Sequence, residues 1–171
     1  MRFAPVLIAF TAGSLAAQSA LKIDPVWLKS DSAAARVEVT LTAGLTGTNG
    51  GMNFNGASAG ALTLTVPVKW TVVLHVLNND QVLPHSVMVI PAVTPVPVTV
   101  AGPAIPHAAT RNSDQGLSSG THEDVQFVAE RPGAFFLYCA VPGHGAAGMW
   151  IHFDVSNTAR QPEFVATPKA Q

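Results

Sequence analysis

Residues 134–155 read AFFLYCAVPGHGAAGMWIHFDV, and this stretch carries the clearest fold signal in the chain. The apolar, aromatic run at 134–138 is typical of a buried strand. In residues 150–155 every second side chain is apolar, which predicts a half-buried strand. Glycine and proline fill the segment between them. The pattern therefore predicts two strands joined by a loop.

The same alternation recurs toward the N-terminus. Apolar residues alternate with Glu or Thr over 36–42 and again over 62–66, and β-branched residues fill 70–77. Shorter strands are expected at 86–90 and around 125–127. No segment has good helical periodicity, and the prolines of 91–106 exclude a helix there. About seven or eight short strands separated by turns predict an all-β fold, a Greek-key β-sandwich.

The composition sets the limits on function. Of 171 residues, 48% are hydrophobic and 11% charged, against a typical charged share of about 25%. A chain this apolar is not disordered. Nine Lys and Arg stand against ten Asp and Glu with no basic cluster, so nucleic acid is not an expected partner.

The N-terminus resembles an export signal. Arg2 precedes the apolar run Val6–Phe10, and small residues follow at positions 16, 17, 19 and 20. We expect residues 1–20 to be a cleaved signal peptide and the protein to be periplasmic or extracellular. An uncleaved membrane anchor is the alternative, although the run is shorter than the roughly 20 residues that span a bilayer.

The rest of the chain divides into three parts. Residues 21–35 are expected to form an irregular lead-in, residues 36–157 the folded domain, and residues 158–171 a loose tail. Within the domain, the proline-rich insertion Pro91–Gly120 either covers the functional site or decorates an edge, and the sequence leaves this open.

Cys139 is the only cysteine, so an internal disulfide is impossible. It starts a C-x4-H-x4-M pattern with His144 and Met149, in a loop that can fold back so that the three side chains converge. His85 lies upstream, immediately before a predicted strand. A sandwich can bring that strand end beside the loop, which makes His85, Cys139, His144 and Met149 a candidate metal site.

Copper fits this donor set better than other metals do. A thiolate with two imidazoles and a weak, distant thioether is the ligand set of a blue-copper centre. Zinc prefers four strong tetrahedral ligands, and a thioether is not among them. Iron–sulfur clusters need more cysteines, and the C-x-x-C-H motif of c-type haem is absent.

The chain resembles the cupredoxins, and within them the sulfocyanin group, with the rusticyanins next. The resemblance covers roughly residues 36–157 and rests on MNFNG at 52–56, LPHS at 83–86, and LYC at 137–139 running to GMW at 148–150. It implies that His85, Cys139 and His144 are equatorial copper ligands and that Met149 is axial.

The resemblance further implies a single-electron carrier, which is not an enzyme and has no substrate. In the family the second histidine, here His144, lies near the surface among small apolar residues, so a redox donor and acceptor are expected to dock there transiently on a monomer. One position departs from the family. Many cupredoxins have Asn after the first histidine, whereas this chain has Ser86, which is expected to alter the potential.

Three other interpretations stay open from the sequence. Cys139 can be a buried core thiol, a nucleophile activated by a histidine, or part of a copper-delivery site without a redox role. An oxidase with a trinuclear copper cluster would need H-x-H motifs, which are absent. The other histidines are expected to be structural: two within strands (His75, His152) and two in polar loops (His107, His122).

Overall fold

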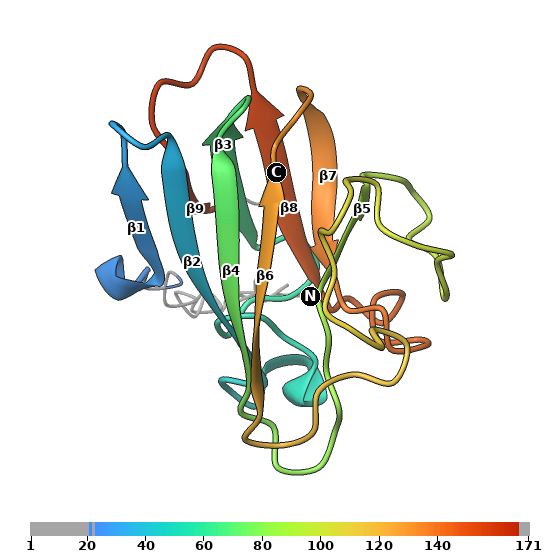
Figure 1. The fold of residues 1–171 in the computed structure, drawn as a ribbon. Coiled ribbons are helices and arrows are strands. Elements are labelled where there is room, and N and C mark those ends of the chain that lie inside the picture. Colours follow the sequence, from blue (N-terminus) through green and yellow to red (C-terminus); the bar gives the residue numbers. More distant parts are fainter. Residues whose placement is uncertain (1–20, 22, 168–171) are drawn as a thin grey trace, which may run out of the picture.

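The computed structural model describes residues 21 and 23–167, so the expected signal peptide lies outside the described residues. These residues form nine strands and two short 3-10 helices (Figure 1). In chain order the elements are η1 (Pro25–Trp27), β1 (Leu28–Asp31), β2 (Arg36–Ala43), η2 (Thr48–Gly51), β3 (Leu62–Pro67), β4 (Thr71–Asn78), β5 (Met88–Pro91), β6 (His122–Val128), β7 (Gly133–Tyr138), β8 (Trp150–Ser156) and β9 (Glu163–Ala166).

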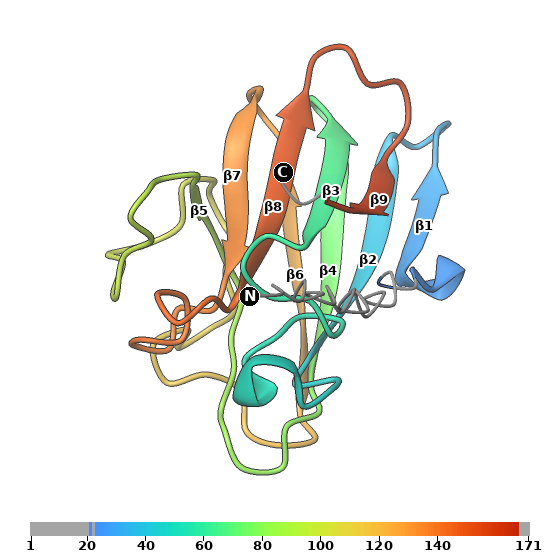
Figure 2. The same cartoon turned by 180° about the vertical axis from the view of Figure 1, so that it is seen from behind.

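The strands form two sheets, which Figures 1 and 2 show from opposite sides. The first sheet has the order β1-β2-β4-β6 and the second β5-β7-β8-β3-β9. Each contains one parallel pair, β2 with β4 and β3 with β8, among antiparallel neighbours. The predicted all-β sandwich is confirmed, with nine strands in place of the seven or eight expected.

The core lies between the two sheets because alternate residues of each strand point inward. In β2 and β3 the burial pattern follows the sequence alternation that predicted the strands. Phe153 of β8 is fully buried and packs edge-on against Phe127, with ring centroids 5.9 Å apart. It also contacts the tilted ring of Phe135, with centroids 6.1 Å apart. These aromatic rings connect the second sheet to β6 of the first.

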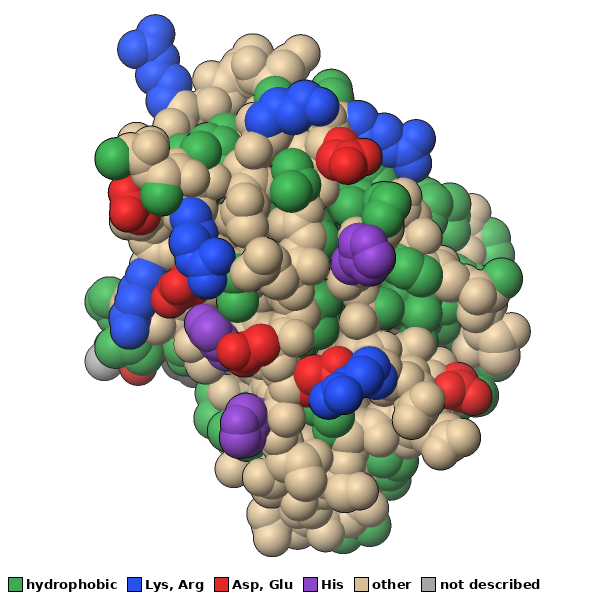
Figure 3. Space-filling view, in the orientation of Figure 1, with side chains coloured by type: hydrophobic (Ala, Val, Ile, Leu, Met, Phe, Trp, Pro, Cys, Tyr) green, Lys and Arg blue, Asp and Glu red, His purple; other side chains and the backbone are tan. Residues whose placement is uncertain are grey.

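The outer face of the first sheet is polar. Arg36, Glu38 and His75 interact across β2 and β4, and His75 Nδ1 lies 2.8 Å from the Asp124 carboxylate on β6. Figure 3 shows acidic, basic and histidine side chains interspersed on this side of the molecule. His75 is therefore a surface sheet histidine, as predicted.

The ordered domain is longer at both ends than residues 36–157. Four residues of the expected lead-in form β1, and four of the expected loose tail form β9. Both are edge strands whose backbones bond a longer neighbour, β2 and β3 respectively. Trp27 and Phe164 also pack together, with centroids 6.3 Å apart. The expectation of irregular ends was thus wrong for these two segments, because the neighbouring strands order them.

The insertion Pro91–Gly120 packs on the outer face of the second sheet over β5 and β7 and reaches the loops at one end of it. Residues Val96, Val100 and Ala109 pack on a second apolar cluster, which contains the buried residues Met88, Ile90, Phe136, Tyr138 and Ala140. The Tyr138 hydroxyl donates to the Pro97 carbonyl at 2.8 Å.

Among the described residues, the structure contains no helix with the length and apolar character of a membrane span.

Candidate metal centre

Three strand ends bring the predicted donors together. His85 lies three residues before β5, Cys139 directly follows β7, and Met149 directly precedes β8. β7 pairs antiparallel with both β5 and β8, so these three ends meet at the same end of the second sheet. His144 lies in the turn between Cys139 and Met149.

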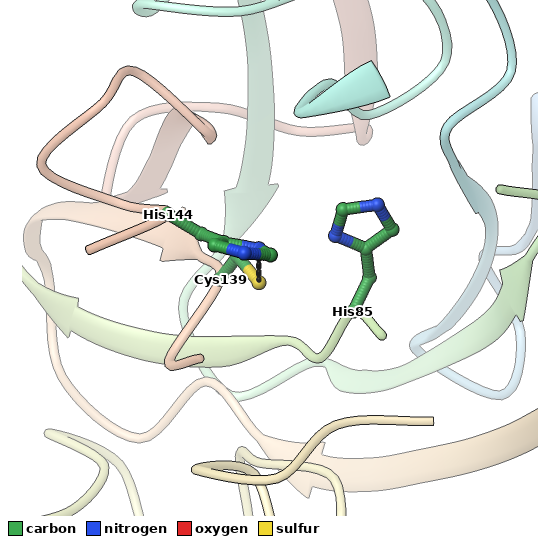
Figure 4. A group of neighbouring side chains, drawn as sticks. All are labelled: His85, Cys139 and His144. Carbon is green, nitrogen blue, oxygen red and sulfur yellow. Dashed lines mark hydrogen bonds between the residues drawn. The ribbon is translucent and has the colours of Figure 1, made fainter. Parts of the chain in front are cut away.

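The donor atoms of His85, Cys139 and His144 all lie within 4.8 Å of one another. Cys139 Sγ is 3.7 Å from His144 Nδ1, and the two imidazole centroids are 5.2 Å apart. Figure 4 shows the three side chains converging, with one ring nitrogen of His85 facing the other two residues and the other nitrogen turned away. The sequence prediction that these residues form a cluster agrees with the structure.

His85 is held with one nitrogen occupied and one free. Its Nε2 lies 3.3 Å from Asp80 Oδ2, and its side chain is 0% exposed. Its Nδ1 is the one buried side-chain nitrogen or oxygen among the described residues that lacks a hydrogen-bond partner. Burial lowers the pKa of His85, and Asp80 only partly opposes this shift. A neutral ring with an unshared lone pair on a buried nitrogen is prepared to bind a metal.

Cys139 is completely buried and contacts Ser86. The Ser86 amide points at Cys139 Sγ from 3.4 Å, and the Ala140 amide donates to the Ser86 hydroxyl at 3.0 Å. The link between the two ligand segments that Asn often provides is therefore made here by Ser86. Burial raises the pKa of the Cys139 thiol. Such a thiol is a poor nucleophile on its own, whereas a bound cation favours the thiolate.

The turn between Cys139 and Met149 is fixed by its own hydrogen bonds. The Met149 amide donates to the His144 carbonyl, and the Cys139 amide to the Met149 carbonyl, both at 3.0 Å. The Met149 side chain is 0% exposed and belongs to the main core. His144 is half-buried, and burial followed by the proximity of His85 lowers its pKa.

The insertion contacts the backbone of this site. The backbones of His85 and Leu117 exchange two hydrogen bonds, at 2.7 and 3.2 Å, and the Gly143 amide donates to the Val98 carbonyl at 3.1 Å. A side chain on Gly116 would collide with the His85 backbone. The question that the sequence left open is thus answered: residues 91–120 do more than decorate an edge, because they pack against both histidine segments.

The remaining histidines lie apart from this cluster. His152 is in β8 and packs edge-on against Trp150, with centroids 5.4 Å apart. His107 is in a loop, as expected, but His122 is the exposed first residue of β6 and not a loop residue. Asp80 is a site residue that the sequence did not single out. It lies in the turn that follows β4, and nothing in the sequence pattern indicates that its carboxylate faces His85.

The chemistry of the clustered donor atoms favours copper and disfavours magnesium and calcium. The orphaned Nδ1 of His85 faces a thiol and a second imidazole, and such a mixed soft and borderline set suits Cu(I) and Cu(II). A soft thiolate and two imidazoles do not suit magnesium or calcium, which prefer oxygen ligands.

A β-sandwich that brings one buried cysteine, one buried histidine and one half-buried histidine together at one end has the architecture of a cupredoxin. A sequence model of the Sulfocyanin (SoxE) domain matches residues 24–166. Sulfocyanin of Sulfolobus acidocaldarius is 32% identical over 117 residues, which are 64% of this chain and 58% of that protein. The chain therefore belongs to the sulfocyanin family, although it spans less than two thirds of this curated relative.

Solved structures support the same fold. Reduced rusticyanin superposes with a TM-score of 0.54 at 22% identity, covering 71% of this chain and 80% of rusticyanin. Dithionite-reduced auracyanin of Roseiflexus castenholzii gives a TM-score of 0.51 at 21% identity, covering 70% of this chain and 96% of auracyanin. Identities this low support the β-sandwich and not a particular activity.

Proposed function

We propose that this protein is a type 1 copper protein that carries single electrons between redox partners. His85, Cys139, His144 and Met149 would hold the ion. The observation that carries the proposal is the buried, unpartnered Nδ1 of His85, which lies in one cluster with a thiol and a second imidazole. When bound, copper supplies a one-electron Cu(I)/Cu(II) couple.

The surroundings suit electron transfer better than copper delivery. Three of the four proposed ligands are fully buried, and only His144 is partly exposed. A delivery protein needs an accessible site that releases its ion, whereas this one is enclosed by β-strand ends and the insertion. Rigid surroundings hold the four ligands in one arrangement and so keep the reorganisation on electron transfer small.

The exposed side of His144 is the proposed docking site for redox partners. Pro142, Ala146 and Ala147 are exposed around it, and residues 140–150 contain no charged side chain. Small apolar surfaces without charge suit brief encounters that bury less than about 1,200 Å². The proposed partners are therefore other redox proteins, with an electron donor and an acceptor binding one at a time to a monomer.

The experiment that tests the function is a titration of the metal-free protein with one equivalent of Cu(II). We expect an intense blue or green absorption band and an EPR spectrum with narrow copper hyperfine splitting. An ordinary, weakly coloured Cu(II) spectrum would reject the type 1 centre and bring copper delivery forward.

Replacing Met149 with Leu should keep the colour and raise the reduction potential. A thioether is a weak axial ligand that favours Cu(II), and leucine has a similar volume but no lone pair. Voltammetry of the variant and of Met88→Leu, a buried methionine of the second cluster, measures the difference. An unchanged potential in Met149→Leu would exclude Met149 as a ligand.

We also propose that the protein is exported and that residues 1–20 are removed. The support is Arg2 followed by the apolar run Val6–Phe10 and a set of small residues. Mass spectrometry of the protein from its native host should show a chain that starts near residue 21. A full-length mass would favour a retained anchor.

A further inference from the structure

We propose that Asp80 is a positioning residue for the metal centre: its carboxylate holds His85 in the tautomer that presents Nδ1 to the metal and places a negative charge beside that ligand. The inference rests on the proposed copper function. It begins from the pair already described, in which Asp80 Oδ2 lies 3.3 Å from His85 Nε2 inside the protein.

The Asp80 carboxylate accepts hydrogen bonds from three N–H groups. Its Oδ1 accepts from the amides of Val82 at 2.8 Å and Leu83 at 2.9 Å, while its Oδ2 accepts from His85 Nε2. These donors approach both side-chain oxygens, so the side chain must be an acceptor at both positions, as a carboxylate is and an amide is not. The two amide donors on Oδ1 are hydrogen bonds that favour the charged carboxylate over the neutral acid.

The surrounding backbone is shaped to admit this carboxylate. A Cβ on Gly51 would overlap Asp80 Oδ2, and one on Gly44 would lie 2.7 Å from Asp80 Cβ. Both glycines also have positive φ, +90° and +66°. The turn is anchored by Asn78, which is fully buried, accepts from the Asp80 amide at 2.9 Å and donates to the Leu83 and Leu117 carbonyls.

The consequence for the metal follows from tautomer and charge. With Asp80 as acceptor, the His85 proton resides on Nε2 and the lone pair on Nδ1, the nitrogen without a partner. A carboxylate bonded to a metal-binding histidine also makes the ring a stronger ligand. The negative charge stabilises Cu(II) more than Cu(I), and so it lowers the reduction potential.

The decisive variant is Asp80→Asn, which keeps the shape but turns one acceptor into a donor. If its NH2 faces His85, it repels Nε2–H and favours the proton on Nδ1. We expect Cu(II) affinity, measured against a competing chelator, to fall roughly 10- to 100-fold. For each tenfold fall in Cu(II) affinity that is not matched by a fall in Cu(I) affinity, the reduction potential should rise by about 59 mV. The control is Asp154→Asn, which removes the same charge from a half-buried side chain on the outer face of β8. It should change neither the Cu(II) affinity nor the reduction potential.

A second measurement needs no variant. Nitrogen-15 NMR of the metal-free wild-type protein should find the His85 proton on Nε2; a proton mainly on Nδ1 would overturn the inference even if Asp80→Asn does not fold. Wild-type Cu(II) affinity and potential in a folded Asp80→Asn would also overturn it. If the wild-type protein gives no type 1 spectrum, it is the proposed function that fails, and the NMR result still decides the tautomer.

Discussion

In the Cys139→Ala variant, the absorption band that Cu(II) produces with the wild-type protein should disappear completely. The colour of a type 1 centre comes from charge transfer between the thiolate and copper, and Cys139 is the only thiol in the chain. No other residue can therefore replace it. The two histidines remain, so any copper that still binds should give an ordinary, pale Cu(II) spectrum.

This loss should be separable from unfolding. Cys139 is buried but small, so its truncation to alanine should cost only about 1 kcal/mol of unfolding free energy in the metal-free protein. Thr110→Ala is the matched control, because Thr110 is 4% exposed, of similar size and bonded to Val87 outside the ligand set. It should keep the band. A band that persists in Cys139→Ala would place the chromophore elsewhere.

The Gly145→Ala variant is expected to damage both stability and the metal centre. Gly145 is buried, and a Cβ at this position would overlap the ring of Tyr138. That ring cannot move aside freely, because Tyr138 is fully buried and its hydroxyl is bonded to Pro97 of the insertion. The turn must shift instead, and His144 and Met149, which share a backbone hydrogen bond, shift with it.

We expect the free energy of unfolding of the metal-free Gly145→Ala protein to fall by about 3 kcal/mol, in the upper part of the usual range for overpacking. Its Cu(II) form should also lose the narrow hyperfine pattern of the wild type. Gly102→Ala is the control, since a Cβ there meets nothing within 4 Å, and it should change stability by no more than about 0.5 kcal/mol. Chemical denaturation and EPR measure both effects. Wild-type stability in Gly145→Ala would show that the turn is looser than the structure implies.

Much of the sandwich was predictable because its central strands are long and half-buried. Alternation located β2, β3 and β8, since one face of each must be apolar, and a run of β-branched residues located β4, all to within about two residues. The edge strands β1 and β9 escaped prediction for the opposite reason. Their sequences, LKSD and EFVA, are too short to show a period, and they owe their conformation to the backbones of β2 and β3.

The site divides in the same way. Cys139, His144 and Met149 were predictable because their C-x4-H-x4-M spacing is a local pattern, and His85 because the LPHS segment at 83–86 resembles the family. Asp80 was not predictable, because its role depends on a side-chain direction inside a turn. The effect of Gly145 was hidden too, since the residue it must avoid, Tyr138, meets it only after the turn has folded.

The strand order of the second sheet also determines when the domain can form. β3 is complete at residue 67, but both of its neighbours, β8 and β9, come from residues 150–166. Strand pairings this distant in sequence are slow to form. Until they do, the backbone of β3 is unpaired and can recruit another chain. The chain must therefore be synthesised as far as β9 before β3 is fully protected, and Met149, which directly precedes β8, joins the proposed ligand set at the same late stage.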